Sequence, residues 1–275
     1  MTSFAEATAV RRTGAGRYAV ELAAGYTPEK TGMVHGGYLL ATLLRAALDA
    51  SPHPDPVATS AHFLRPGTPG PAEVRLESLK EGRTVAVTRA SLVQGGKTVL
   101  SAHVTTADLG EDPATAWASE PPPIPPVEEC VRMDPAHAHS PGVRFLQRLD
   151  VRMDPATVGW VDGMPNETPE IRAYFRLREG YRPDPFLVAF AVDAKPPVSV
   201  STGRFGPVST VELTLHLRAR PADGWLALHA RGRLLGEDWF DEEVEVRDST
   251  GRLVAQSRQL LHRGGGGRRP GGPAA

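Results

Sequence analysis

The chain contains a single cysteine, Cys130, among its 275 residues. One cysteine cannot form an internal disulfide, and it cannot supply the paired thiolates of a structural zinc site. The sequence also lacks a run of about 18 apolar residues, which a transmembrane helix requires. The first residues lack the charged start and apolar core of a signal peptide. We therefore expect a cytoplasmic protein that does not insert into a membrane.

An excess of charge of one sign is also missing. Lys and Arg number 31 and Asp and Glu number 32, which gives a formal net charge of -1. Proteins that bind nucleic acids usually carry a clustered basic excess, so we expect no nucleic-acid partner. The G-x-S-x-G motif of serine hydrolases is absent as well. Any catalysis should therefore use other oxygen and nitrogen groups.

Glycine and proline, by contrast, are plentiful, with 28 and 26 residues. Residues 121–126 (PPPIPP) favour a stiff extended connector. The sequence after residue 263 is rich in Gly, Arg and Pro and cannot bury apolar surface. We therefore predict a first unit over residues 1–110, a proline-rich linker over 111–142, a second unit over 143–263 and a disordered tail over 264–275. His137 and His139 lie in the linker without a third ligand, so we expect no metal site.

The two predicted units resemble each other. In the first, a segment that begins AHFLR at residue 61 leads to a turn at Lys97, and in the second LHLR at residue 215 leads to a turn at Arg252. This similarity predicts an internal duplication. Alternating or β-branched patterns predict antiparallel strands in both units, over residues 71–78, 84–92, 98–106, 211–218, 225–234, 239–247 and 253–261.

Each unit also contains one apolar segment that predicts a buried helix. The first, over residues 38–48, has so narrow a polar stripe that other elements must enclose it. It follows His35, Gly36 and Gly37, which we consider candidates for contacts to an oxyanion or phosphate, because glycines give a ligand close access to the free amides at a helix start. The alternative is that these glycines only permit a tight turn into the helix.

The second apolar helix is predicted over residues 185–194, after Asp184 as N-cap and Pro185 in the first turn. An acidic residue, Asp193, lies in its last turn. Both the helix dipole and burial disfavour a carboxylate at this end of a helix. Because costs of this kind concentrate at functional sites, Asp193 is a candidate catalytic residue, although an exposed Asp at the end of the helix is the alternative.

Several strings resemble the bacterial type II acyl-CoA thioesterase family. They are VHGG (34–37), SAHFLRPG (60–67) and KEGR (80–83) in the first unit, and LVAFAVD (187–193), STVE (209–212) and LVAQSRQ (253–259) in the second. The resemblance spans residues 25–110 and 183–263. It implies an α+β double hotdog fold, in which two tandem units each wrap a curved antiparallel sheet around a central helix.

The same resemblance implies the function. In that family an Asp, a Thr and a Gln orient the hydrolytic water, and they correspond here to Asp193, Thr210 and Gln259. It further implies an acyl-CoA substrate, no cofactor and a role in fatty acid metabolism, with homo-oligomers common. The first-unit counterparts of these three residues are Leu44, Pro56 and Val104, so we predict one water-activating site per chain.

The sequence leaves three alternatives open. The substrate could be an acyl carrier protein thioester instead of acyl-CoA. The protein could be a non-catalytic acyl-CoA-binding protein. It could also be a hotdog hydratase or dehydratase, enzymes that commonly pair an Asp with a His. No histidine lies near Asp193 in the sequence, but a histidine close to it in space would favour this last alternative.

Overall fold

The computed structural model describes residues 2–27, 32–111, 115–133 and 144–264. His137, His139 and residues 265–275 of the predicted tail lie outside the described residues. The predicted domain division stays a prediction, although the strands described below fall into two matching groups.

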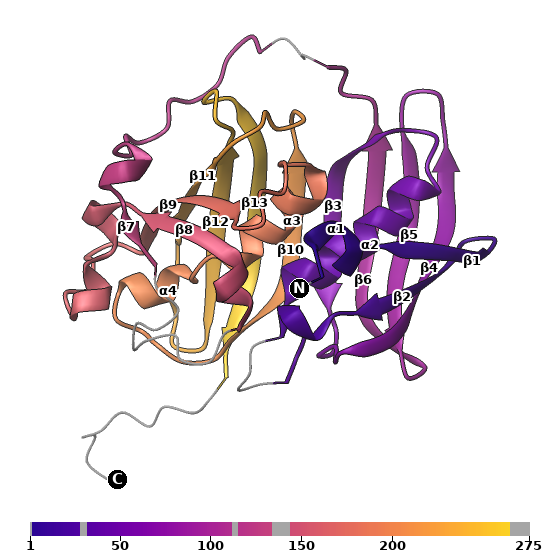
Figure 1. The fold of residues 1–275 in the computed structure, drawn as a ribbon, viewed down its shortest axis with the longest axis horizontal. Coiled ribbons are helices and arrows are strands. Elements are labelled where there is room, and N and C mark those ends of the chain that lie inside the picture. Colours follow the sequence, from indigo (N-terminus) through magenta and orange to yellow (C-terminus); the bar gives the residue numbers. More distant parts are fainter. Residues whose placement is uncertain (1, 28–31, 112–114, 134–143, 265–275) are drawn as a thin grey trace, which may run out of the picture.

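Within the described residues, thirteen strands form one continuous sheet in which every pair is antiparallel (Figure 1). The first group comprises β1 (Val10–Gly14), β2 (Arg17–Leu22), β3 (Asp55–Phe63), β4 (Gly70–Glu81), β5 (Ala86–Gln94) and β6 (Lys97–Ala107). The second comprises β7 (Val131–Arg132), β8 (Leu149–Met153), β9 (Glu170–Leu177), β10 (Val208–Leu217), β11 (Leu226–Arg231), β12 (Trp239–Arg247) and β13 (Leu253–Arg263).

The strand order confirms the double hotdog fold. It runs β1-β2-β4-β5-β6-β3 through the first group and β10-β13-β12-β11-β9-β8-β7 through the second. The equivalent strands β3 and β10 pair at the centre, with His62 opposite Glu212 and Ala58 opposite His216. Outward from this pair, each strand of one group has a counterpart in the other, apart from the extra edge strand β7.

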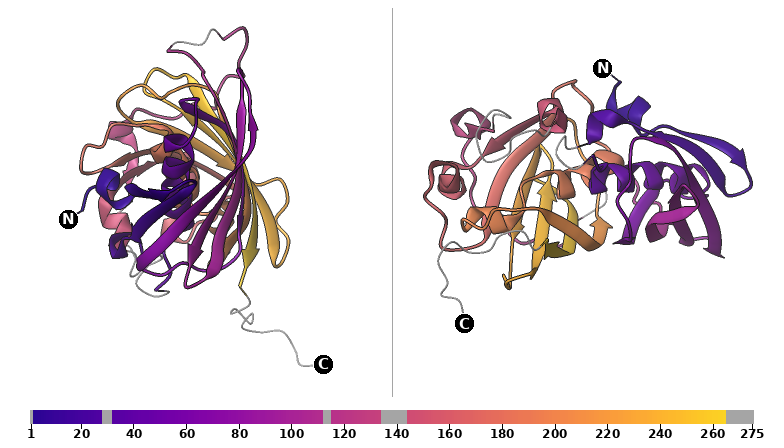
Figure 2. Two further views of the ribbon diagram at one scale, coloured as in Figure 1. Left: turned by 90° about the vertical axis from the view of Figure 1, so that its right-hand side faces the viewer. Right: turned by 90° about the horizontal axis from the view of Figure 1, so that it is seen from below.

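The two predicted helices lie on the concave side of the sheet and pack against each other (Figure 2). They are α2 (Gly36–Asp49) and α3 (Pro185–Ala194), and both carry nearly continuous buried apolar side chains. Asp184 caps α3 by accepting the N–H of Leu187 at 2.8 Å. The helix ends at Ala194, because Lys195 precedes a proline and is pushed out of helical geometry.

A polar network joins the two units beside these helices. Arg45, in the polar stripe of α2, donates to the hydroxyl of Tyr181 at 2.8 Å. Tyr181 in turn donates to Asp184, the N-cap of α3. The first helix, α1 (Phe4–Ala7), buries Phe4 against Phe190 of α3 with ring centroids 5.5 Å apart. The orientation of the two units is thus fixed by both polar and apolar contacts.

Several elements were not predicted. The hairpin β1–β2 forms the edge of the first unit, and β8 and β9 extend the second. Residues 131–132, within the predicted linker, form β7 and pair with β8. Short helices complete the described chain: α4 (Val198–Ser201), η1 (Ala24–Tyr26), η2 (Val127–Glu129), η3 (Arg144–Arg148), η4 (Pro155–Thr157) and η5 (Gly159–Asp162).

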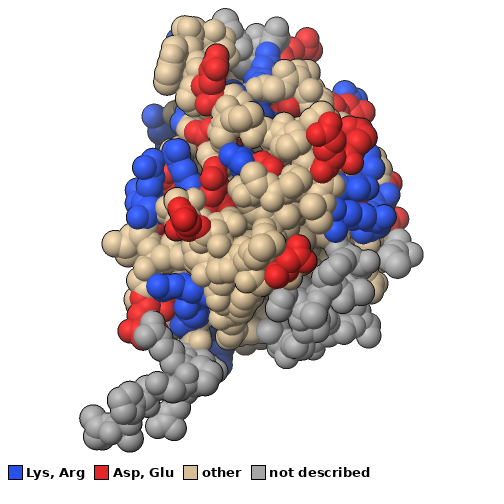
Figure 3. Space-filling model, turned by 90° about the vertical axis from the view of Figure 1, so that its left-hand side faces the viewer, with Lys and Arg blue, Asp and Glu red and all other residues tan. Residues whose placement is uncertain are grey.

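In the part of the chain that the structure describes, no helix is both long and apolar enough to cross a membrane. On the face shown in Figure 3, acidic and basic side chains are interspersed, in keeping with the near-zero net charge.

Cys130 is buried, and burial raises the pKa of its thiol. A thiol in such surroundings is a packing residue, not a nucleophile.

Candidate active site

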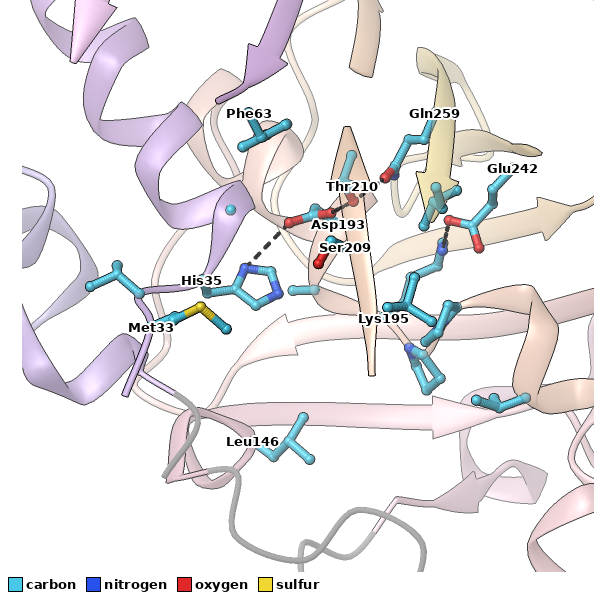
Figure 4. Close-up of a pocket in the computed structure, with 18 of the residues that line it drawn as sticks. Met33, His35, Phe63, Leu146, Asp193, Lys195, Ser209, Thr210, Glu242 and Gln259 are labelled. Atoms are coloured by element: carbon cyan, nitrogen blue, oxygen red, sulfur yellow. Dashed lines mark hydrogen bonds and ion pairs between the residues drawn. The ribbon is translucent and has the colours of Figure 1, made fainter. Parts of the chain in front are cut away.

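The carboxylate of Asp193 lies where the C-terminal turn of α3 meets the N-terminus of α2 (Figure 4). Its Oδ2 accepts the backbone N–H of Gly37 at 2.6 Å. Its Oδ1 accepts the hydroxyl of Thr210 at 3.1 Å. The carboxylate sits at the unfavourable end of its own helix, but the amide and the dipole of the other helix stabilise its charge.

Thr210 and Gln259 extend this chain of contacts. The Thr210 hydroxyl, on β10, lies 3.1 Å from Oε1 of Gln259, on β13. Because a hydroxyl has one proton, Thr210 donates to Asp193 or to Gln259 at any one time. The Gln259 amide donates to the carbonyl of Val192 at 3.0 Å, which fixes its orientation. The structure thus brings the three residues expected from the sequence into one hydrogen-bonded row.

A register shift between Thr210 and Glu212 places Thr210 in this row. Bulges of this kind bend a strand locally and re-aim its side chains, and they are common next to active sites. The local geometry of β10 is therefore part of how the site is built.

His35, the N-cap of α2, reaches the other side of the carboxylate. Its Nδ1 lies 3.5 Å from Asp193 Oδ2, and the side chains are 14% and 10% exposed. Burial lowers the pKa of His35, although the Asp193 carboxylate opposes this shift. The imidazole is therefore neutral near pH 7. The sequence did not predict this proximity, and it is the observation on which the dehydratase alternative depends.

The two glycines at the start of α2 differ in part from their expected role. The Gly37 amide donates to Asp193, so it is occupied by a protein carboxylate and does not face a substrate oxyanion. A Cβ at Gly37 would lie 2.9 Å from both Asp193 Cβ and the Phe190 carbonyl oxygen, and one at Gly36 would lie 3.0 Å from Asp193 Oδ2. Both glycines therefore allow α2 and α3 to approach closely, which is more than a tight turn requires.

A cavity of about 610 Å³ opens beside this row. Its volume falls within the range of about 300–1,000 Å³ that is usual for small-ligand sites. Apolar side chains of the second unit form much of its wall, among them Leu146, Leu149, Val151, Trp160, Val161 and Phe205. Met33 and Leu64 of the first unit also line it and are 39% and 51% exposed. The cavity can therefore hold an apolar chain with one end next to Asp193.

A buried ion pair in the wall of the cavity was not predicted from the sequence. The ammonium of Lys195 binds the carboxylate of Glu242, and each side chain is only 1% exposed (Figure 4). A signal was present: Phe240, Val244 and Val246 are the inward residues of β12, and the same alternation places Glu242 on the inward face. An acidic residue at an inward strand position is unusual unless it is paired.

Comparison with known proteins agrees with this fold. Family models described as the N-terminal and C-terminal domains of acyl-CoA thioesterase match residues 25–107 and 127–262. A crystal structure from Thermobifida fusca, assigned as a thioesterase II, is 41% identical and has a TM-score of 0.89, covering 96% of this chain and 98% of that one.

Two mycobacterial proteins are also similar. An uncharacterised protein of Mycobacterium tuberculosis is 35% identical, and the match covers 82% of this chain and 84% of that protein. The structure of acyl-CoA thioesterase II TesB2 from Mycobacterium marinum is 18% identical, with a TM-score of 0.72 over 95% of this chain and 98% of that one. At this lower identity the likeness concerns the fold.

Proposed function

The chain belongs to the acyl-CoA thioesterase family, and we propose that it hydrolyses acyl-CoA to a free acid and CoA with a water activated by Asp193. The observation that carries this proposal is the hydrogen-bonded row of Asp193, Thr210 and Gln259 at the wall of a cavity with an apolar interior. A carboxylate, a hydroxyl and an amide together offer both donors and acceptors to a water molecule.

In the proposed reaction, a water oxygen attacks the thioester carbonyl while Asp193 accepts a proton from that water. A new carbon–oxygen bond forms, and the carbonyl oxygen becomes an oxyanion. When the tetrahedral intermediate collapses, the carbon–sulfur bond breaks, and the thiolate of CoA takes up a proton. General-base catalysis of this type contributes roughly 10²–10⁴-fold to a rate.

The oxyanion needs a donor, and we assign this role to the backbone N–H of Gly36. It is the first residue of α2, and the first amides of a helix have no partner within the helix. The neighbouring Gly37 amide binds Asp193, so the carboxylate base and the oxyanion would be bound by adjacent amides of one helix start. Preorganised donors of this kind stabilise charge that develops in the transition state.

The apolar part of the cavity would receive the acyl chain. Apolar residues of the second unit, such as Leu146, Trp160 and Phe205, line this part of the cavity. Pro196 and Pro197 also line the cavity, and their rigid backbone limits how far the wall can move. We propose that this part of the cavity sets the preference for acyl chain length.

A second candidate function follows from His35. Its ring lies 3.5 Å from the Asp193 carboxylate, and an Asp–His pair is what a hotdog hydratase or dehydratase commonly uses. Such an enzyme would remove water from a 3-hydroxyacyl thioester, breaking a C–H and a C–O bond and leaving the thioester intact. The contacts of Asp193 to Thr210, and of Thr210 to Gln259, favour hydrolysis over this reaction.

Product analysis of the wild-type chain separates these functions. Acyl-CoA and acyl carrier protein substrates of increasing chain length are incubated with the protein, and free thiol and free acid are quantified. Matching amounts of thiol and acid support hydrolysis and identify the carrier. Interconversion of 3-hydroxyacyl-CoA and enoyl-CoA without thiol release supports the dehydratase. Binding with neither product supports an acyl-CoA-binding protein.

A further inference from the structure

The buried pair of Lys195 and Glu242 is a feature that the proposed reaction does not use. Lys195 is the C-cap residue of α3, two positions after Asp193. Its ammonium binds one oxygen of Glu242, and the other oxygen accepts the N–H of Val198 at 2.8 Å. Glu242 therefore holds both ends of the short segment that follows α3.

This pair lies directly beside the proposed active site. Glu242 on β12 is the register partner of Gln259 on β13, so their side chains stand next to each other on the inward face. Gln259 binds the carbonyl of Val192, and Glu242 binds the side chain of Lys195. Val192 lies just before Asp193 in the chain, and Lys195 lies two positions after it. Both are thus bound to the sheet, by two residues that stand opposite each other on neighbouring strands.

Burial makes this arrangement unusual. Both side chains are 1% exposed, and removing two charges from water is costly even when they pair. Apolar side chains of similar volume often give equal or greater stability at such a position. If this position had to supply stability alone, uncharged side chains would therefore suffice. A salt bridge that also binds a backbone amide holds the segment in one geometry.

We propose that Lys195 and Glu242 are positioning residues that hold the last turn of α3, and with it Asp193, in register with Thr210 and Gln259. This inference rests on the proposed hydrolysis. The pair touches neither the attacking water nor the carbonyl in this assignment. It acts by keeping the Asp193 carboxylate within reach of both. A displacement of about 1 Å at such a group can lower a rate by roughly 100-fold.

The test compares Glu242→Gln with a matched control, Asp55→Asn. Asp55 is also 1% exposed, binds a cation, Arg220, and accepts a backbone N–H, that of Leu109 at 2.9 Å. It does not line the cavity. For each variant the measurements are kcat, Tm and the affinity for an acyl-CoA analogue in which a thioether replaces the thioester.

We expect both variants to lose thermal stability, because each replaces a buried carboxylate that binds both a cation and a backbone N–H. Only Glu242→Gln should lower kcat, by about 10- to 100-fold, while its affinity for the thioether analogue stays within about twofold of wild type. A kcat for Glu242→Gln within about twofold of wild type, or a loss equal to that of Asp55→Asn, would overturn the inference.

A double variant keeps the test decisive if Glu242→Gln does not fold. Lys195→Met combined with Glu242→Leu removes both charges and keeps the volume, so it should fold stably. We expect its kcat to remain low, whereas a wild-type kcat would contradict the positioning role. If the wild-type chain itself released no thiol, the proposed function would fail. Thiol release by Glu242→Gln at the wild-type rate would leave that function intact and reject only this inference.

Discussion

The backbone amide of Gly37, in the first turn of α2, donates a 2.6 Å hydrogen bond to the carboxylate of Asp193, in the last turn of α3. The two residues are separated by 156 positions and belong to different hotdog units. The N-terminal end of one central helix therefore stabilises a charge at the C-terminal end of the other. The site is complete only when both units are in place.

The close approach of the two helices predicts that Gly37 does not tolerate a side chain. In Gly37→Ala, the new Cβ would lie 2.9 Å from the Phe190 carbonyl oxygen and from Asp193 Cβ, so α2 and α3 must move apart. We expect a loss of stability of about 1–3 kcal/mol and a marked fall in thiol release. Thermal unfolding and activity are compared with Gly14→Ala, where nothing lies within 4 Å. Equal behaviour of the two variants would contradict this account of the helix contact.

The hydroxyl of Thr210 is predicted to matter more than its shape. Thr210→Val keeps the volume but removes the donor to Asp193, and a hydrogen bond to a charged group contributes about 1.5–3 kcal/mol. We therefore expect kcat to fall by roughly 10- to 150-fold, and Thr210→Ser to recover most of it. Thr214→Val is the control, since Thr214 lies on the same strand and donates to Glu212. Full activity of Thr210→Val would show that the hydroxyl is dispensable.

The buried histidine predicts a pH dependence of stability. Burial lowers the pKa of His35 below its ordinary value of 6.5, so the unfolded chain binds more protons than the folded one just below that pH. Stability is therefore retained above about pH 6.5 and lost as the pH falls below it. His229 has a pKa lowered by burial as well and adds to the effect.

The measurement is Tm from pH 8 to pH 5 for wild type, His35→Gln and His229→Gln, a range of about three pH units around the ordinary pKa of histidine. Each variant should show a weaker loss of Tm on acidification than wild type, because one group that must take up a proton on unfolding is gone. Identical slopes for wild type and His35→Gln would mean that His35 is not held neutral by the fold.

The internal duplication predicts a single site per chain. The first-unit counterparts of Asp193 and Gln259 are Leu44 and Val104, and both are fully buried core residues. Titration calorimetry with the thioether analogue should therefore give one bound ligand per chain. Two equivalent sites per chain would require a constellation that the first unit does not supply.

Much of this fold follows from local sequence patterns. The strands over residues 239–247 and 253–261 and the apolar helix before Asp193 were predicted, because period-2 alternation and an uninterrupted apolar run are strong local signals. The hairpin β1–β2 was not predicted, although Tyr18, Val20 and Leu22 alternate as its buried face. Residues 131–132 join the sheet through pairing with β8, which no local pattern indicates.

The site was predictable only in part. Resemblance to a family identified Asp193, Thr210 and Gln259, and the chain folding brings them together. The contacts of Asp193 with His35 and Gly37 depend on how two helices from distant parts of the chain meet, so spacing could not indicate them. The inward position of Glu242 could have been predicted from the sequence, since the alternation along β12 indicates it.

The most direct test of the central claim is the kcat of Asp193→Asn for acyl-CoA. The substitution keeps the size of the side chain and removes the proposed base, so we predict a fall of roughly 10²–10⁴-fold. The far-ultraviolet circular dichroism spectrum should remain that of wild type, and Asp55→Asn, a buried aspartate outside the cavity, should retain its kcat. Hydrolysis of acyl-CoA by folded Asp193→Asn at the wild-type rate would contradict the account.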